Sequence, residues 1–380
     1  MTPRILIIAG SDSGGGAGIQ ADIKTVTMLG GHAMTAITAI TAQNTLGVQA
    51  VMPVPAEMVV AQARACADDI GVDAVKIGMI GSAETAHAVA DWLAALDPAR
   101  PIPIVFDPVM VATSGAVLAD ADTIAAFGRL MDLCTVVTPN LPELAALGGE
   151  AAVLARAPAL LVKGGHGDGA MLVDRLVTHA APASIHAGAQ WESERIESTA
   201  THGTGCTLAS ALAVNLARGK PLKAAIARAR QFVRLAIKDA PGLGQGHGPM
   251  GQQQVRQDLG PGPRLNQVTL PSAGAATDLA FYEALGLRQV VATDHGYARF
   301  EAPGGTTLSL EAGARPTIFL EVEDLDSQLV RLRRLGIDVA EVPTDQPWRW
   351  REARLTDPSG NAVCLFAADE NRRYPPWRIA

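Results

Sequence analysis

The first 250 residues alternate short apolar runs typical of β-strands with longer segments in which apolar residues recur at helical spacing. Strands that are apolar throughout and separated by helices are typical of a parallel sheet covered on both faces. We therefore predict an α/β fold with a mainly parallel sheet and helices on both faces. We expect strands at residues 5–9, 33–41, 74–78, 102–107, 135–138 and 160–163, and helices at 19–29, 56–69, 83–95, 121–131, 142–147, 207–218 and 222–239.

The strand at residues 5–9 leads directly into a glycine-rich loop, GSDSGGGAG at residues 10–18. Strand, glycine loop and helix in this order are typical of a nucleotide or small-molecule site, because glycine lets the backbone approach a ligand. The loop fits neither the P-loop pattern GxxxxGK[ST] nor a clean GxGxxG with a downstream acidic residue, which argues against both of those sites. Asp22 follows one helical turn into the helix, and its spacing alone favours a solvated helix residue.

A second glycine-bearing stretch, THGTGCT at residues 201–207, precedes another helix-like run. The N–H groups that open a helix lack partners within it and the helix dipole adds positive potential, so an anion bound there would be stabilised. A nucleophile at this point would lie where transferred phosphoryl charge is held. Considered alone, the stretch is explained equally well as a glycine turn that caps a helix.

Polar side chains fall at the ends of three successive predicted strands. Asp107 closes one strand, the stretch TPNLPE with Asn140 and Glu143 closes the next, and Lys163 closes the third. Each has an ordinary explanation as a turn residue, a helix cap or an exposed lysine. Together they would place carboxylates, an amide and a cation at one edge of the sheet. Phosphoryl transfer needs such a set, with a magnesium site, a cation near the phosphates and donors for the developing charge.

The composition restricts the partners and the compartment. The chain of 380 residues suggests about two domains, and a net charge of −7 without a long basic run argues against nucleic-acid or membrane partners. The apolar run at residues 5–9 is too short for a membrane span, and we see no signal peptide. The four cysteines are far apart with no CxxC pair, which argues for a reducing, cytoplasmic setting: Cys66, Cys134, Cys206 and Cys364.

Seven motifs in this order resemble the hydroxymethylpyrimidine/phosphomethylpyrimidine kinase family of thiamine biosynthesis, which belongs to the ribokinase-like superfamily. The motifs lie at residues 9–25, 38–45, 76–79, 107–110, 138–143, 162–166 and 202–207, and GHGP at residues 246–249 is similar to the end of the family's domain. The stretch between residues 147 and 160 departs from the family, because it is short and rich in Ala and Gly. We therefore expect a truncated helix and strand there.

The resemblance implies an ATP- and Mg²⁺-dependent kinase that acts on a CH₂OH group and, in the family, also on the monophosphate. It implies a pyrimidine pocket in which Gln43 and Asp22 suit an aminopyrimidine and Met79 packs on the ring. The implied pocket residues are Gly10, Asp22, Gln43, Met79 and Val109.

The resemblance also implies a phosphate side of the site. Asn140 and Glu143 are similar to the family's magnesium-site motif, Asp107 is a second metal-site candidate, and Lys163 is similar to a phosphate-side cation. Residues 203–206 are similar to the anion hole: Gly203, Thr204, Gly205 and Cys206. Many ribokinase-like enzymes have an Asp base where this subfamily has Cys206, and because a helix start lowers the pKa of a thiol we expect a thiolate base.

The pattern changes after residue 250. Residues 241–263 are rich in Gly, Gln and Pro, so we predict a kinase domain at 1–250, a linker at 251–263 and a second domain at 264–380. In the second domain a strand, a helix and further strands occur twice, which predicts an α+β domain of paired βαβββ units.

The second domain resembles the vicinal oxygen chelate superfamily, which includes glyoxalases and bleomycin-resistance proteins, in the stretches at residues 281–287, 321–326 and 357–361. Only one of its four metal-ligand positions holds a good divalent-metal ligand, which favours a ligand-binding or dimerisation module. These positions are Gln267, Glu311, Thr317 and Cys364. Trp348, Arg349 and Trp350 are candidates to line a pocket for a flat ring, although ordinary half-buried positions are favoured.

Other functions stay open at this stage. Pyridoxal or pyridoxine kinase is the alternative among enzymes, although Gln43 and Met79 favour the pyrimidine. A non-catalytic pyrimidine sensor is another, and the intact phosphoryl-transfer set argues against it. The second domain could also sequester a toxic pyrimidine analogue. Since members of both families commonly pair, we expect a homodimer.

Overall fold

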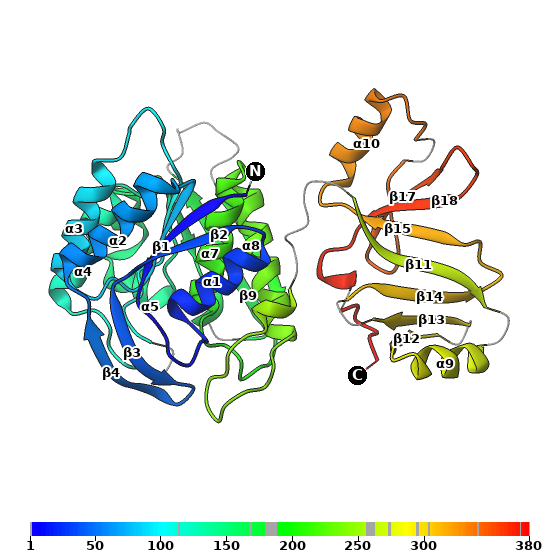
Figure 1. Cartoon of the computed structure of the whole chain (residues 1–380), viewed down its shortest axis with the longest axis horizontal. Helices are drawn as coiled ribbons and strands as arrows, with labels where there is room; N and C mark the ends of the chain where they lie inside the picture. Colours follow the sequence, from blue (N-terminus) through cyan, green and yellow to red (C-terminus); the bar gives the residue numbers. More distant parts are fainter. Residues whose placement is uncertain are drawn as a thin grey trace. The chain divides into compact units, whose positions relative to one another are not determined.

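The computed structural model divides the chain into two compact units, Met1–Asp258 and Leu259–Ala380 (Figure 1). It describes residues 2–112, 115–166, 169–178, 188–255, 263–272, 275–293, 296–302, 305–339, 342–372 and 374–379. In this part of the chain no helix is both long and apolar enough to cross a membrane.

The first unit contains the predicted parallel sheet. Its eight strands follow the order β10-β9-β8-β7-β6-β5-β1-β2, in which the run from β8 to β2 is parallel. β9 pairs antiparallel with β8 on one side and with β10 on the other. The strands are β1 (Arg4–Ala9), β2 (His32–Ile37), β5 (Ala74–Ile77), β6 (Ile104–Phe106), β7 (Val136–Val137), β8 (Ala159–Val162), β9 (Met171–Thr178) and β10 (Gly188–Glu194).

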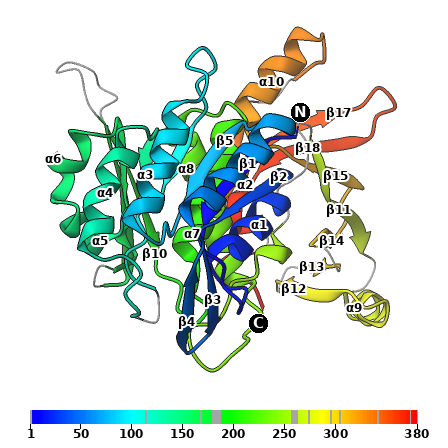
Figure 2. The same ribbon diagram turned by 60° about the vertical axis from the view of Figure 1, so that its left-hand side comes forward.

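Helices cover both faces of this sheet, which confirms the predicted fold class (Figures 1 and 2). Apolar side chains such as Leu6, Ile77 and Phe106 pack against α2, α3 and α4 on one face. On the other face, α7 contacts α1, α8 and the central strands. The helices are α1 (Gly18–Met28), α2 (Ala56–Asp69), α3 (Ala83–Ala94), α4 (Ala121–Met131), α5 (Leu141–Ala146), α6 (Gly149–Leu154), α7 (Thr204–Ala217) and α8 (Leu222–Lys238).

The single strand predicted at residues 33–41 is wrong. The chain leaves the main sheet at Thr38, whose N–H donates to the carbonyl of Ala9 and whose hydroxyl donates to the carbonyl of Met79 at 2.7 Å. Residues beyond it form β3 (Ala39–Asn44), which pairs with β4 (Gly47–Pro53) in a separate two-stranded sheet. The break carries Gln43 away from the main sheet and toward the glycine loop.

Two other local predictions also need correction. The truncation expected between residues 147 and 160 is limited to the helix, because α6 has six residues while β8 pairs with β7 and β9. Part of the predicted linker packs on the first unit, where Gln252 is fully buried and donates to the hydroxyl of Thr207. Residues 256–262 of that linker lie outside the described residues.

The second unit consists of two βαβββ repeats, as predicted, in one eight-stranded sheet of order β12-β13-β14-β11-β15-β18-β17-β16. The repeats meet where β11 and β15 pair antiparallel. The first contains β11 (Arg264–Ser272), α9 (Ala275–Ala284), β12 (Arg288–Ala292), β13 (Tyr297–Glu301) and β14 (Thr307–Ala312). The second contains β15 (Thr317–Glu321), α10 (Leu325–Arg334), β16 (Thr344–Asp345), β17 (Arg351–Thr356) and β18 (Ala362–Ala367).

Candidate active site

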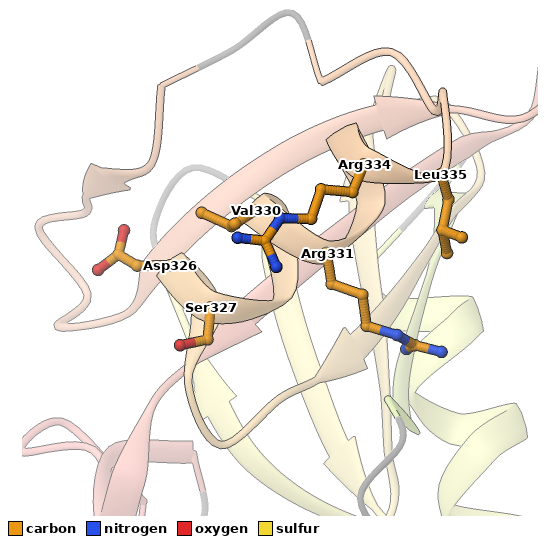
Figure 3. A pocket seen from close by; sticks show the side chains of 6 residues that line it. All are labelled: Asp326, Ser327, Val330, Arg331, Arg334 and Leu335. Atoms are coloured by element: carbon orange, nitrogen blue, oxygen red, sulfur yellow. The ribbon is translucent and has the colours of Figure 1, made fainter.

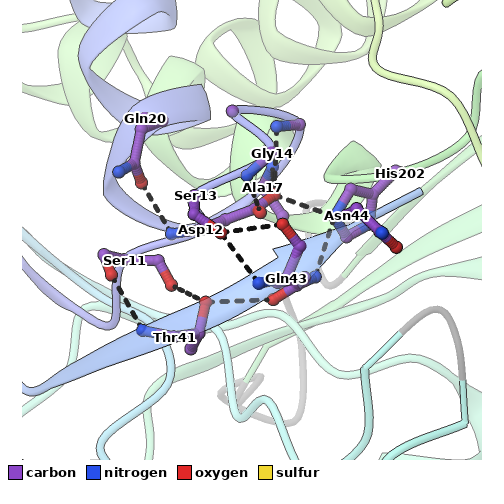
Figure 4. Close-up of polar contacts among 12 residues, drawn as sticks. Ser11, Asp12, Ser13, Gly14, Ala17, Gln20, Thr41, Gln43, Asn44 and His202 are labelled. Atoms are coloured by element: carbon purple, nitrogen blue, oxygen red, sulfur yellow. Dashed lines mark hydrogen bonds and ion pairs between the residues drawn. The ribbon is translucent and has the colours of Figure 1, made fainter. Parts of the chain in front are cut away.

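The glycine-rich loop between β1 and α1 is organised by Asp12 (Figure 4). Its carboxylate accepts hydrogen bonds from the backbone N–H groups of Gly14, Gly16 and Ala17 at 2.7–3.0 Å. The side chain is 2% exposed. Burial alone would raise the pKa of Asp12, but hydrogen bonds from His202 and these N–H groups bring it below its ordinary value. Asp12 therefore acts as a fixed anion that shapes the loop.

Asp12 also links the loop to the start of α7. His202 Nε2 lies 2.9 Å from Asp12 Oδ2, and the amide nitrogen of Gln43 lies 3.0 Å from the same ring nitrogen (Figure 4). A carboxylate can only accept, so Nε2 of His202 must carry the hydrogen that it donates to Asp12. A ring nitrogen that carries a hydrogen cannot accept from Gln43, so the Gln43 side chain bonds it when the amide oxygen faces the ring. Three segments far apart in the sequence thus meet at one buried histidine.

The two glycine stretches touch through their backbones. A Cβ on Gly203 would lie 2.0 Å from the carbonyl oxygen of Gly16, and Gly203 has a φ of +81°. A Cβ on Gly18 would lie 2.4 Å from the carbonyl oxygen of Gly10. Glycine is needed here both for the left-handed conformation and for the close approach. Gly203 is also the N-cap residue of α7, so this contact fixes where the helix begins.

A charge cluster lies at the carboxyl ends of β6, β7 and β8. Lys163 Nζ is 2.6 Å from Asp107 Oδ1 and 3.9 Å from Glu143 Oε2. The hydroxyl of Thr138 donates to the same Asp107 oxygen at 3.0 Å. Burial alone would lower the pKa of Lys163, but the two carboxylates raise it above its ordinary value. Lys163 is therefore a fixed cation at the edge of the sheet.

Asn140 and Glu143 form the capping box of α5. The side-chain oxygen of Asn140 accepts from the N–H of Glu143, and the Glu143 carboxylate accepts from the N–H of Asn140, both at 2.8 Å. The ordinary role of Asn140 as a helix cap is therefore real. Burial raises the pKa of Glu143, Lys163 lowers it and Asp107 raises it again, with a net rise. The capping box holds Glu143 beside the charge cluster.

The start of α7 reaches this cluster at Gly205. A Cβ on Gly205 would lie 3.1 Å from Lys163 Nζ and 3.2 Å from Asp107 Oδ2. The absent side chain lets the first turn of the helix approach the lysine and the carboxylate. The structure thus brings the N–H groups of a helix start, one cation and two carboxylates together, as the strand-end pattern predicted. Thr204 is half-buried in the same turn.

Cys206 is not the thiolate that we expected from its position at a helix start. Burial raises the pKa of its thiol to about 11, because the effect of Lys76, which lowers the pKa, is outweighed by burial and by the carboxylates of Asp22 and Asp107. The backbone N–H of Gly18 also contacts the sulfur and lowers the pKa. At neutral pH the thiol is protonated in this structure.

The expectation of a solvated Asp22 is also wrong. Its carboxylate is fully buried, accepts from Lys76 Nζ at 2.7 Å and from the hydroxyl of Ser210 at 2.7 Å. Burial alone would lower the pKa of Lys76, but Asp22, Cys206 and Asp107 raise it, so the lysine stays charged. The carboxylate that the resemblance assigned to the pyrimidine is therefore bonded to groups from β5 and α7.

The other pocket candidates lie near the glycine loop. A Cβ on Gly10 would be 3.0 Å from the sulfur of Met79, which brings these two residues together. Met79, Val109 and Gln43 are half-buried and Gly10 is buried. Val109 follows Asp107 closely and its N–H donates to the Asp107 carbonyl at 2.8 Å. Gly10, Met79 and Val109 thus follow the carboxyl ends of β1, β5 and β6, while Gln43 comes from β3.

Three residues that organise this region could not be singled out from the sequence pattern: Asp12, Lys76 and His202. All three lie inside the motifs, and an apolar strand that contains a lone lysine is a signal for a buried ion pair. Nothing in the spacing pairs Asp12 with His202, which are 190 residues apart.

The donor chemistry suits a magnesium ion at Asp107 and Glu143. Mg²⁺ is commonly held by one or two carboxylates together with water and substrate phosphates. Among the described residues, no group of three or more His, Cys, Asp or Glu side chains is placed to hold a metal by itself. The pair therefore fits a magnesium site that substrate phosphates complete, and does not fit an all-protein metal cage.

A separate depression lies on the second unit, along α10 (Figure 3). Its lining comes from one face of this single helix, which does not enclose a ligand on several sides: Asp326, Ser327, Val330, Arg331, Arg334 and Leu335. None of the predicted site residues belongs to it.

The fold and the charge cluster of the first unit define a ribokinase-like kinase. A family model described as phosphomethylpyrimidine kinase matches residues 12–251, and one described as glyoxalase/bleomycin resistance protein/dioxygenase superfamily matches residues 264–365. The chain therefore belongs to the phosphomethylpyrimidine kinase family and carries a C-terminal domain of the glyoxalase type.

Three known proteins illustrate these relationships. The hydroxymethylpyrimidine/phosphomethylpyrimidine kinase of Rhizobium meliloti is 47% identical over 66% of this chain and 97% of its own length. The thiamine biosynthesis bifunctional protein of Geobacter sulfurreducens is also 47% identical, over 67% of this chain, but the match spans only 53% of that longer protein. The structure of pyridoxal kinase from Bacillus subtilis with ADP has a TM-score of 0.58 and 32% identity, and covers 67% of this chain and 98% of its own.

The two ends of α7 offer a matched test of the backbone contact. We expect Gly203→Ala to lower the free energy of unfolding of the first unit by far more than Gly219→Ala, measured by chemical denaturation. Both glycines have a similar positive φ, +81° and +75°, but a Cβ on Gly219 meets nothing within 4 Å. Gly219→Ala should therefore cost only the conformational term of about 1–2 kcal/mol. Equal losses for the two variants would contradict the contact.

Proposed function

We propose that the first unit transfers the γ-phosphoryl group of ATP to the hydroxymethyl group of 4-amino-5-hydroxymethyl-2-methylpyrimidine and then phosphorylates the monophosphate to the diphosphate, in thiamine biosynthesis. The observation that carries this proposal is the meeting of Lys163, Asp107 and the start of α7 at Gly205. Family membership supports the choice of a pyrimidine substrate.

In this proposal, the phosphate side of the site stabilises charge. The N–H groups of the first turn of α7, from Gly203 to Cys206, donate to the transferred phosphoryl group, and Lys163 adds a positive charge beside it. Asn140 fixes Glu143 by the capping box, and Glu143 and Asp107 would hold the magnesium ion. When bound, Mg²⁺ neutralises phosphate charge. Because phosphoryl transfer needs mainly positioning and charge stabilisation, this set supplies most of what the transfer step requires. The proton of the hydroxymethyl group needs a separate acceptor, for which Cys206 is the candidate.

The pyrimidine side uses the residues around the glycine loop. Gly10 and Met79 offer a close, apolar surface to the ring, and Gln43 offers its amide to the ring nitrogen or the exocyclic amine. The hydrogen bond to His202 fixes the side chain of Gln43. Asp22 acts here as a positioning residue, because it holds Lys76 rather than a substrate. Val109 closes the pocket near Asp107.

Pyridoxal is the second candidate substrate. The similarity of the first unit to pyridoxal kinase from Bacillus subtilis supports this alternative. Both substrates present a hydroxymethyl group on a flat nitrogen ring, so a small change in the pocket can decide between them.

We also propose that the protein is a cytoplasmic homodimer. None of the four cysteines forms a disulfide, in agreement with a reducing compartment: Cys66, Cys134, Cys206 and Cys364. Pairing is supported only by what is common in the two families.

The substrate assignment is tested by ADP release from the full chain with Mg-ATP. We expect turnover with the hydroxymethylpyrimidine and with its monophosphate, and slower turnover with pyridoxal. Excess EDTA should abolish the activity and added Mg²⁺ should restore it, since the phosphate charge is no longer neutralised without the metal. Turnover of pyridoxal alone would make the protein a pyridoxal kinase, and no turnover of any of the three would leave a non-catalytic sensor.

The protonation state of Cys206 predicts a pH dependence. If its thiolate accepts the proton of the hydroxymethyl group, kcat should rise by about tenfold per pH unit between about pH 7 and 9, because the pKa of about 11 lies above this range. Cys206→Ala should lower kcat by about 100-fold or more and flatten this profile. A flat profile in the unchanged protein, or nearly full turnover in Cys206→Ala, would exclude Cys206 as the base.

A further inference from the structure

One face of the sheet in the second unit is unusually polar. On β13, Phe300 packs against Tyr282 of α9, so its neighbour Arg299 points to the opposite face. The strand register places Arg299 beside Ser309 of β14, and Ser309 beside Thr269 of β11. All three are at most 5% exposed. This face therefore buries polar side chains at positions where a core would hold apolar ones.

The neighbours of Arg299 satisfy one another. The hydroxyls of Thr269 and Ser309 lie 2.6 Å apart, and Gln267 accepts from Thr307 at 3.0 Å. Tyr297 hydrogen-bonds the side chains of Ser309 and Gln267. The polar groups that surround the arginine are thus already engaged with each other.

Arg299 itself has two free donors. Among the residues that the structure describes, Nε and Nη2 are buried without a hydrogen-bond partner. These two nitrogens lie on the same edge of the guanidinium plane, so their N–H groups point in the same direction. This edge matches two oxygens of a carboxylate or phosphate.

Aromatic packing holds this edge in place. The guanidinium carbon of Arg299 lies 5.7 Å from the centroid of Trp350, which is 4% exposed. Phe366 stacks on the same indole at 4.3 Å, and Phe319 packs edge-on against both rings. The indole of Trp350 is therefore occupied by protein groups. Its role is to support the arginine, in line with the ordinary packing role that the sequence favoured over a pocket for a flat ring.

Glu301, the carboxylate whose charge raises the pKa of Arg299, is shared with two other arginines. Glu301 Oε2 contacts Arg288 at 3.1 Å and Arg378 at 3.0 Å. Burial lowers the pKa of Arg299, Tyr297 and Glu301 raise it, and the positive charges of Arg372 and Arg378 lower it further. Two other arginines are thus among the charges that act on Arg299, and two of its buried nitrogens have no acceptor. An anion would supply both a negative charge and the missing acceptor.

We propose that the second unit binds a small organic anion, and that Arg299 takes its carboxylate or phosphate group through Nε and Nη2. The site is independent of the kinase site and does not rest on the proposed kinase function. The proposed site needs no metal. It therefore differs from the four positions that hold the metal ligands in metal-binding members of the superfamily. At two of these positions the side chains are already used: Gln267 accepts a hydrogen bond from Thr307, and Thr317 donates one to the carbonyl of Arg315.

The test measures binding of radiolabelled benzoate and phenyl phosphate to the full chain by equilibrium dialysis. We expect at least one of the two anions to occupy a site that is lost, or weakened by about tenfold or more, in Arg299→Met. Benzoate alone would identify a carboxylate site, phenyl phosphate alone a phosphate site, and both a general oxyanion site. Arg288→Met is the matched control, because Arg288 lies on the adjacent strand with 66% of its side chain exposed, and it should bind as the unchanged protein does.

A second measurement separates binding from folding. Without an anion, Arg299→Met should unfold at the same temperature as the unchanged protein or at a higher one, because methionine fills the space without a buried charge. The anion that binds should raise the unfolding temperature of the unchanged protein only. Equal isotherms for both proteins, no saturable binding of either anion, or a lower unfolding temperature for Arg299→Met would overturn the proposal.

Discussion

The backbone contact between Gly16 and Gly203 is the constraint on which the site depends. No other residue type allows the start of α7 to lie against the glycine loop, since a Cβ on Gly203 would lie 2.0 Å from a carbonyl oxygen. A hydrogen bond between the side chains of Asp12 and His202 stabilises this backbone contact. Because α7 begins at this point, its first turn faces the carboxyl ends of β6 and β8, where Gly205 lies beside Lys163.

Two lysine–carboxylate pairs give the site its charge. Lys76 with Asp22 is fully buried, while Lys163 with Asp107 keeps a small exposed fraction at the edge of the sheet. A fully buried pair is suited to positioning, because neither group can reach a ligand without leaving the other uncompensated. The pair at the edge is suited to phosphate and metal binding. Both pairs also act on Cys206, whose thiol stays protonated because burial and two carboxylates outweigh the effect of Lys76.

The sequence predicted the architecture well because periodic apolar patterns report burial directly. The parallel sheet and the paired βαβββ units follow from the order of apolar strands and helices along the chain. The cluster of Asp107, Glu143 and Lys163 at one edge follows from their positions at strand ends. It failed where one contact between distant residues decides the outcome. The predicted strand at residues 33–41 is interrupted by the hydrogen bonds of Thr38. The predictions of a solvated Asp22 and of a Cys206 thiolate were wrong because the spacing of residues does not reveal that these side chains are buried. Arg299 gave no signal, because an unpaired donor is visible only in three dimensions.

The central claim is that Lys163 and the start of α7 form the phosphoryl-transfer centre, whereas the pyrimidine is held elsewhere, near Gln43 and Met79. The most direct test compares Lys163→Met with the unchanged protein, using kcat for phosphorylation and the calorimetric Kd for the hydroxymethylpyrimidine. The account predicts a loss in kcat of about 100-fold or more, with little change in Kd. A variant that keeps its turnover, or that loses pyrimidine binding while it remains folded, would contradict this division of the site.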